Sequence, residues 1–316
     1  MLESVKGDEA ARILMSGLPP VGAGRSAGSP VAVGSGARGV ELVRQLAHRF
    51  SEFPYENISK IIKAANSATL AEAMRLPTEV VTDHIERNFG GTCFSLSFLF
   101  ERVLKSFGFD CYKVMADMNS GRNVHCLVVV KEAGVTYMVD PGYALYEVVA
   151  LPEHGTQRVC FPHAAVEVAA DPGTHDDTHD GAHDGAHDET RQHRLYAQYG
   201  LWTEDASGRK WRYTFRDTPV ADPEFETHWL ESFGKPTLHN ICITRMTPRG
   251  HLYFRKDFFK FTSPTAIEKR KLKLEREREK FIEQEFGIGG EWVEIAQKLL
   301  DERRALDERR AANWPK

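Results

Sequence analysis

Residues 88–107 read Asn88-Phe89-Gly90-Gly91-Thr92-Cys93-Phe94-Ser95-Leu96-Ser97-Phe98-Leu99-Phe100-Glu101-Arg102-Val103-Leu104-Lys105-Ser106-Phe107. Apolar side chains recur in this stretch at steps of three and four residues, which is typical of a helix with one buried face. Thr92 stands at the N-cap position, and Gly108 follows the last apolar residue as a C-terminal stop. The pattern therefore predicts a helix with Cys93 in its first turn.

A cysteine at this position has a physical route to nucleophilicity. Free N–H groups and the positive end of the helix dipole favour a thiolate over a thiol. The preceding Gly90-Gly91 pair lets backbone amides approach a ligand closely, as an oxyanion hole requires. The alternative is an inert thiol, because a single cysteine on a buried face is usually a small core residue.

The composition narrows the class of protein. The chain has 316 residues, 41% of them hydrophobic, which is enough for a sizeable core. Its net charge of −4 gives no basic excess for nucleic acid, and no apolar run reaches the length of a membrane span. Its 5 cysteines form no C-x-x-C pair, which argues against a disulfide framework or a zinc knuckle. We expect a cytoplasmic protein that contacts neither nucleic acid nor membrane.

Shifts in composition and periodicity divide the chain into five predicted segments. A leader of small residues is expected to be flexible, and a charged helix is predicted over residues 266–286. The segments are a flexible leader (1–39), a helical domain with Cys93 (40–110), a β domain (111–222), a mixed helix and strand region (223–288) and a C-terminal helical extension (289–316).

A low-complexity tract at 171–193 interrupts the β domain. The four-residue spacing of His175, His179, His183 and His187 would place their imidazoles on one helix face, which could hold a soft divalent metal. Interleaved Gly and Asp residues oppose helix formation and keep the tract solvated. We expect a disordered surface insertion, with adventitious metal binding as the alternative, and assign it no function.

A predicted hairpin supplies the second part of a site. Residues 124–130 and 135–140 read as strands, joined by a loop at 131–134 that ends in Gly. If the residues flanking the loop face each other, the antiparallel register places His125 directly opposite Asp140. Directly opposed side chains share a face, with Cβ atoms roughly 4.5 to 5.5 Å apart.

A His-Asp pair next to a thiol is a known chemical combination. The carboxylate would hold the imidazole of His125 in one tautomer and leave its other nitrogen to serve a nucleophile. With Cys93 this makes a Cys-His-Asp set suited to acyl transfer through a thioester. His125 is otherwise an ordinary strand histidine, and a one-residue slip would part it from Asp140. Cys126 points to the opposite face and is expected in the core.

Motifs in this order resemble those of the arylamine N-acetyltransferases. Gly90-Gly91-Thr92-Cys93-Phe94 resembles the family's R-G-G-x-C-F-E segment, and Phe53-Pro54-Tyr55-Glu56-Asn57-Ile58 is similar to its P-F-E-N-L element. Val124-His125, followed by Val139-Asp140-Pro141-Gly142-Tyr143, resembles its His strand and D-x-G-F/Y element. These motifs span residues 40–145, about a third of the chain, and residues 281–288 are weakly similar to its C-terminal F-G-I ending.

The resemblance implies an α+β fold in which a helical domain, an antiparallel β-barrel domain and an α/β lid surround a cysteine-protease-like Cys-His-Asp core. It implies a ping-pong reaction in which acetyl-CoA acylates Cys93 and an arylamine, hydrazine or N-hydroxyarylamine takes the acetyl group. The catalytic residues would be Cys93, His125 and Asp140. Substrate contacts are expected at Gly91, Phe94, Asn123 and Tyr143.

Two positions depart from the family pattern. Phe89 stands where the family has Arg, and Ser95 where it has Glu. Losing both partners of an ion pair avoids stranding one buried charge, so the fold can survive. The electrostatics around Cys93 would nonetheless differ.

Other functions fit the same residues. One thiol set could serve an amide synthase, an acyltransferase with a carrier-protein or non-acetyl CoA donor, or a papain/transglutaminase-like thiol hydrolase. A third class is a non-catalytic binding or scaffold protein. In the leading hypothesis the partners are acetyl-CoA as cosubstrate and a small-molecule amine as acceptor, without a metal. The C-terminal helices are a candidate contact for a homo-oligomer.

Overall fold

The computed structural model describes residues 2, 7–17, 38–161, 164–170, 197–205, 207–247, 249–263 and 265–312. The predicted insertion at 171–193, with its four histidines, lies outside the described residues, as does most of the predicted leader. Among the described residues, no helix combines the length and the hydropathy that a membrane span requires.

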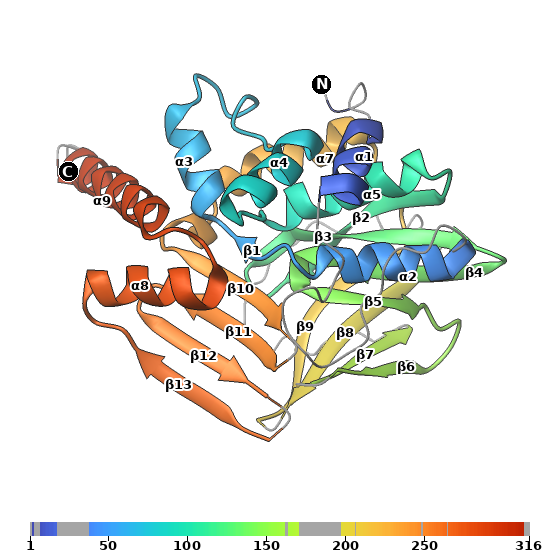
Figure 1. Ribbon diagram of the computed structural model, residues 1–316. Helices are drawn as coiled ribbons and strands as arrows, with labels where there is room; N and C mark the ends of the chain where they lie inside the picture. The colour runs from blue at the N-terminus through green and yellow to red at the C-terminus, as the bar shows by residue number, and fades with distance from the viewer. Residues whose placement is uncertain are drawn as a thin grey trace, which may run out of the picture.

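A group of helices covers one side of the molecule (Figure 1). The central helix α5 is buried from Cys93 to Leu104, and its last two residues are exposed. Its neighbours α1 and α4 pack on one side and strands β2 and β3 on the other. The helices are α1 (Asp8–Gly17), α2 (Gly39–Phe50), α3 (Ile58–Asn66), α4 (Pro77–Arg87) and α5 (Cys93–Ser106).

Helix α1 lies within residues 1–39, which were predicted to be a flexible leader. Residues 8–17 are helical, and the side chains of Ala10 and Leu14 are fully buried beside α4 and α5. Ala10 and Leu14 are one helical turn apart, which is too short a repeat to indicate a helix by itself. The Gly- and Ser-rich sequence that follows them is typical of a flexible segment.

An eight-stranded antiparallel sheet curls into a nearly closed barrel. Its edge strands β5 and β6 follow each other in the chain, and the sheet bends until they approach each other. Alternate residues of β3 face two cores: Leu127 and Val129 fill the barrel, whereas Val128 and Val130 pack toward α2 and α5. The strands, in sheet order, are β5 (Leu145–Ala150), β4 (Val135–Asp140), β3 (Gly121–Glu132), β2 (Asp110–Met118), β9 (Gly208–Arg216), β8 (Gln198–Asp205), β7 (Ala165–Ala170) and β6 (Thr156–Cys160).

The hairpin of β3 and β4 differs from the predicted register by two residues. Its loop is the two-residue turn Ala133-Gly134, with φ values of 50° and 79°, so Glu132 pairs with Val135. Gly suits such a turn, but Ala gave no signal that it would adopt a left-handed conformation. A shift of two residues keeps every side chain on its predicted face, so His125 and Asp140 still lie on the same side of the sheet.

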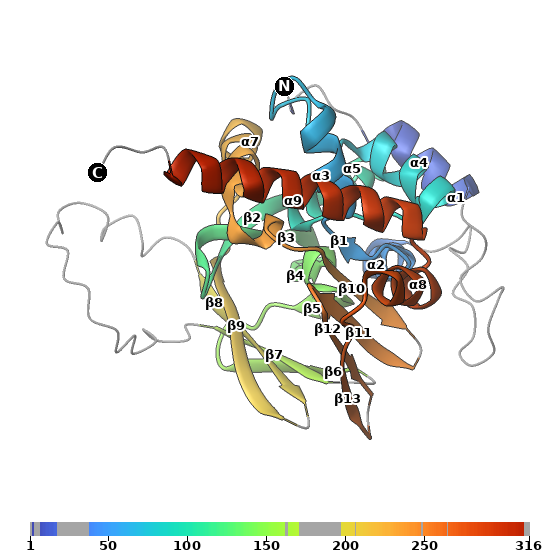
Figure 2. The same ribbon diagram turned by 90° about the vertical axis from the view of Figure 1, so that its left-hand side faces the viewer.

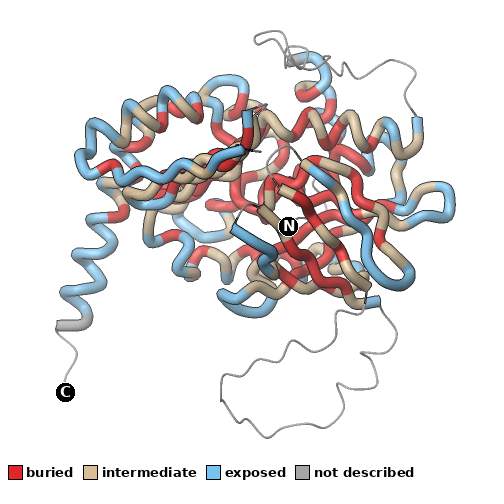
Figure 3. The backbone as a smooth tube through the Cα atoms, turned by 90° about the horizontal axis from the view of Figure 1, so that it is seen from below, coloured by how far each residue is buried: buried red, intermediate tan, exposed pale blue. Residues whose placement is uncertain are grey.

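A second sheet and the last helices complete the fold. Helix α8 lies along this sheet in Figure 1, and Figure 2 shows α9 crossing α3, against which it packs. In Figure 3 the buried backbone runs through the middle of the molecule, and the end of α9 is exposed. These elements are α7 (Asp222–Glu231), β1 (Tyr55–Glu56), β10 (Cys242–Thr247), β11 (Gly250–Arg255), β12 (Phe258–Thr262), β13 (Ile267–Lys271), α8 (Glu275–Phe286) and α9 (Gly290–Ala312), with short 3-10 turns η2 (Pro141–Tyr143), η3 (Ser232–Gly234) and η4 (Pro236–Leu238).

The first part of the predicted charged helix at 266–286 is a strand. Residues 267–271 form β13, which pairs along its length with β12 at the edge of the sheet, and the helix begins only at Glu275. Backbone pairing to β12 overrides the helix preference of this charged run, and charged side chains are typical of an exposed edge strand.

Candidate active site

Cys93 is the first residue of α5, as predicted. Thr92 before it is extended, with φ −85° and ψ 173°, but its side chain makes no capping hydrogen bond. The residue is 7% exposed, and its sulfur lies 3.9 Å from the carbonyl oxygen of Val124 on β3. The helix start therefore brings the sulfur to the strand that carries His125.

His125 and Asp140 form the predicted pair. The distance from His125 Nε2 to Asp140 Oδ2 is 2.7 Å, and the carboxylate is fully buried. The same Oδ2 accepts a hydrogen bond of 2.6 Å from the hydroxyl of Tyr213, and Oδ1 accepts one of 3.0 Å from the backbone N–H of Tyr143. Three donors hold the carboxylate and leave Nδ1 of the imidazole to act toward other groups.

The thiol and the imidazole favour the charged pair. The hydrogen bond with Cys126 lowers the pKa of Cys93 most, and the hydrogen bond and charge of His125 lower it further, against burial, to well below its usual range. Burial opposes a charge on His125, but Asp140 and Cys93 outweigh it and raise the pKa of His125 to about 10. Both shifts favour the thiolate–imidazolium form of the pair over the neutral form. Cys126 is a core residue, as expected, and it also contacts the reactive thiol.

The turn η2 packs directly on this pair. A Cβ added to Gly142 would lie 2.5 Å from Cys93 Cβ and 3.3 Å from His125 Cε1. Real Cβ atoms do not approach each other this closely, so only glycine allows the backbone to lie against both groups.

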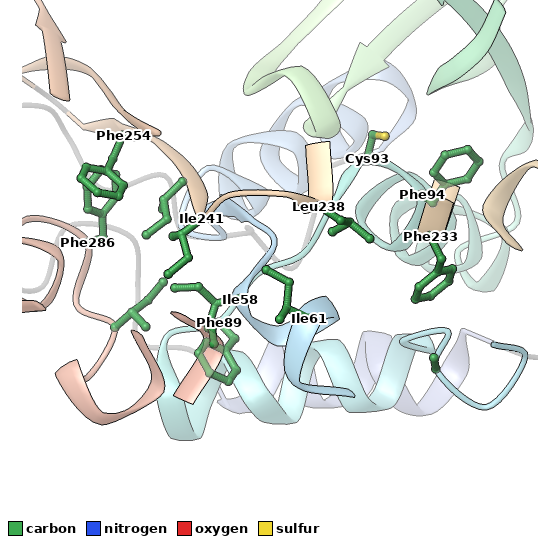
Figure 4. Packing of buried hydrophobic residues seen from close by; sticks show 14 of the residues in the cluster. Ile58, Ile61, Phe89, Cys93, Phe94, Phe233, Leu238, Ile241, Phe254 and Phe286 are labelled. Carbon is green, nitrogen blue, oxygen red and sulfur yellow. The ribbon is translucent and has the colours of Figure 1, made fainter. Parts of the chain in front are cut away.

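The pair opens into a cavity of about 600 Å³ between the barrel, the second sheet and the segment after α7. Figure 4 shows Cys93 at the edge of an apolar cluster that includes Phe94, Phe233 and Leu238. Among the described residues that line the cavity, Asp205 is the one carboxylate, and it lies 3.4 Å from Lys260. The basic lining residues are Lys60, Arg212, Lys235, Arg255 and Lys260.

The predicted substrate contacts separate into two pairs. Phe94 and Tyr143 line the cavity, but Gly91 and Asn123 are not among its lining residues. The N–H of Gly91 donates to Pro54 O at 3.3 Å, so it is not free to serve as the expected oxyanion donor. Asn123 adopts a φ of 52°, and its N–H donates to Asp117 Oδ1 at 2.8 Å. Both residues shape the backbone around the site.

Arg75 provides a buried cation behind the Gly90-Gly91 turn. It is 3% exposed and lies in the connection before α4. Its Nη1 donates to Gly90 O at 2.5 Å and to Ser59 Oγ at 2.6 Å, and lies 3.6 Å from Glu56 Oε1. The structure thus places an arginine beside this turn, although motif position 89 itself is Phe.

Phe89 has taken another role. Its ring packs edge-on against Trp292 of α9, with centroids 5.6 Å apart, and so helps to dock the C-terminal helix.

The sequence does not predict the contribution of Arg75 or of Tyr213 to the site. A signal for a distant cation is the acidic Glu56 beside the apolar Phe53, Pro54 and Ile58, and nothing local places Tyr213 beside Asp140.

Comparison with known proteins gives a family match and several similar folds. A family model described as N-acetyltransferase matches residues 40–293. No curated protein sequence matches the chain. The fold is similar to that of an arylamine N-acetyltransferase from Mycobacterium abscessus (16% identity, TM-score 0.68, covering 95% of this chain and 96% of that one). It is also similar to the enzyme from Salmonella typhimurium (16% identity, TM-score 0.65, 92% and 98%).

A third solved structure is an arylamine N-acetyltransferase from Bacillus cereus, described as having a unique Cys-His-Glu catalytic triad. Its identity to this chain is 16% and its TM-score 0.58, with 81% of this chain and 93% of that one covered. At these identities the structures establish the α+β fold with its nearly closed barrel.

Proposed function

This chain belongs to the arylamine N-acetyltransferase family, and from that premise we propose that it transfers an acetyl group from acetyl-CoA, through a thioester on Cys93, to a small-molecule amine. One observation carries the proposal: Cys93 and His125, with His125 bonded to the buried Asp140, line a cavity that also contains basic side chains, and the pKa shifts of the two groups favour a thiolate. A thiolate prepared in this way attacks a thioester without needing a separate base.

In the first half-reaction the sulfur of Cys93 attacks the carbonyl carbon of the donor thioester. The carbon–sulfur bond to CoA breaks, and the proton of the His125 imidazolium goes to the departing thiolate. The products are acyl-Cys93, free CoA and a neutral imidazole. Asp140, held by Tyr213 and Tyr143, keeps the ring oriented throughout.

In the second half-reaction the amine attacks the acyl carbon. His125 takes the proton that the nitrogen loses, and the thiolate of Cys93 leaves. The amide is released, and the thiolate–imidazolium pair is restored. Arylamines, hydrazines and N-hydroxyarylamines are the proposed acceptors, and the aromatic lining residues Phe94, Tyr143 and Tyr253 suit a flat acceptor.

The basic residues of the cavity support a donor that carries phosphates. Arg212, Lys235 and Arg255 line the cavity and make no ion pair with a described carboxylate. Cations of this kind hold phosphate groups of a CoA-type donor. A cytoplasmic location is part of the proposal, because all 5 cysteines are free.

Steady-state kinetics test the proposal. With acetyl-CoA and 4-methoxyaniline both varied, we expect parallel double-reciprocal lines and an N-acetylated product, and no product from Cys93→Ala. Intersecting lines, or full activity in Cys93→Ala, would contradict it. Release of CoA without an acetylated amine would favour the thiol-hydrolase alternative instead.

A further inference from the structure

A buried lysine faces the same cavity as the reactive thiol. Lys60 lies in the first turn of α3, is 5% exposed, and is one of the residues that line the cavity with Cys93 and His125. The helix is fixed at this end because Asn57, just before it, donates to Thr237 O and Asn240 O and accepts from Cys242 N–H. The position of Lys60 is therefore set by the fold.

The ammonium group of Lys60 has few polar partners among the described residues. Its Nζ donates to Ser232 Oγ at 2.5 Å and lies 4.1 Å from the ring centroid of Phe233. No described carboxylate lies within ion-pair distance, whereas Lys63, three residues further on, is paired with Glu79 at 2.5 Å. An ammonium has three N–H donors, and Ser232 accepts one of them.

Burial lowers the pKa of Lys60 to about 8, with only the thiols Cys93 and Cys126 opposing the shift. The group is thus still mostly charged at neutral pH. Fully buried lysines are rare unless they are paired or functional, because removing an ammonium from water is costly. A ligand anion would complete this environment.

Lowering the pKa of Cys93 does not by itself explain why Lys60 is buried at this site. The pKa of Cys93 is lowered first by Cys126 and then by His125, and the charge of Lys60 comes after both. The ammonium of Lys60 thus contributes to the low pKa of Cys93 after these two groups, and it also faces the cavity in which a substrate would lie.

We propose that Lys60 is a carboxylate-binding residue that makes this enzyme prefer a substrate with an anionic end close to the reacting carbon. The carboxylate belongs either to the amine acceptor or to the far end of the acyl group. This inference rests on the proposed acyl transfer, and it names the substrate class of the same site.

Two pairs of substrates distinguish the sources. In the acceptor pair, 4-aminobenzoate is compared with 4-aminobenzamide, with acetyl-CoA as donor. In the donor pair, malonyl-CoA is compared with isovaleryl-CoA, in which an isopropyl group replaces the carboxylate, with 4-methoxyaniline as acceptor. We expect kcat/KM to favour the carboxylate by about 10- to 100-fold in one pair, the usual size of a charged hydrogen bond.

Variants assign the preference to Lys60. In Lys60→Met, which keeps the length of the side chain, kcat/KM should fall much more for the carboxylate substrate than for the neutral one, so that the ratio falls to near 1. Lys60→Arg should restore part of the preference. Lys63→Met, on the same helix but outside the cavity lining, should behave as wild type.

Calorimetry of Cys93→Ala protein with 4-aminobenzoate and with malonyl-CoA tests binding without turnover. If no donor acylates the protein yet Lys60→Met weakens this binding, the proposed function fails and the carboxylate site stands. If transfer occurs without a carboxylate preference in either pair, the site is refuted and the function stands. An equal loss on neutral and anionic substrates in Lys60→Met would also refute it, because the lysine would then act on the thiolate or the fold.

Discussion

Replacing Arg75 with Met should destabilise the protein and disturb the turn before Cys93. Arg75 is 3% exposed and Glu56 is fully buried, so the substitution leaves a buried carboxylate without its cation. It also removes the donors to Gly90 O and Ser59 Oγ and the 2.7 Å ion pair with Asp83, which keeps Arg87 as a partner. Breaking a buried ion pair from one side costs about 3–5 kcal/mol.

The assays are unfolding by guanidinium chloride, which gives the free energy, and thermal unfolding, which gives the melting temperature, with catalysis measured on the remaining folded protein. At roughly 2 °C per kcal/mol for a chain of this size, the melting temperature should fall by about 6–10 °C. Because Arg75 holds the carbonyl of Gly90, we expect kcat to fall by about tenfold or more as the Cys93 turn loosens.

A second substitution separates the ion pair from packing. In Arg75→Met with Glu56→Gln the stranded charge is removed, so the double variant should be more stable than the two single changes predict, with a coupling of about 1–3 kcal/mol. Arg44→Met, which removes an exposed pair with Glu41, should cost less than about 1 kcal/mol. Additive effects, or a loss below about 1 kcal/mol for Arg75→Met, would refute the reasoning.

Three further predictions concern the catalytic groups. Tyr213→Phe removes one donor to Asp140, so stability should fall by about 1–3 kcal/mol in denaturant unfolding and kcat should fall with KM nearly unchanged. Since the pKa of Cys93 lies well below its usual range and that of His125 is raised to about 10, alkylation of Cys93 by iodoacetamide should fall less steeply between pH 8 and pH 6 than that of an ordinary thiol. A tenfold loss of rate per pH unit, as for an ordinary thiol, would contradict the thiolate. Gly142→Ala should retain circular dichroism but lose acylation, because its Cβ would meet Cys93; full acylation would show that the turn can move.

The local parts of the site could be predicted from the sequence. The helix start at Cys93 follows from apolar spacing and a cap position, and the pairing of His125 with Asp140 follows from the alternation of side chains along strands. The hairpin prediction placed both side chains on the correct face although its loop was two residues too long. Side chains along a strand alternate between its two faces, so a register error of two residues leaves each side chain on the predicted face. For this reason the prediction still placed His125 and Asp140 together.

The parts that depend on distant segments could not be predicted. Arg75 and Tyr213 reach the site only through tertiary packing, from a connection before α4 and from β9. Residues 267–271 carry a helical charge pattern, but they pair with β12, which no local signal indicates. The buried position of Lys60 likewise depends on Ser232 and Phe233, far along the chain.

Intact-mass measurement after incubation with acetyl-CoA tests the central claim most directly. The wild-type protein should gain one acetyl group, located by peptide mapping to Cys93, and lose it when 4-methoxyaniline is added. Cys93→Ala should gain none. The absence of an adduct in the wild type, or an equal adduct in Cys93→Ala, would mean that Cys93, His125 and Asp140 do not form an acyl-transfer site.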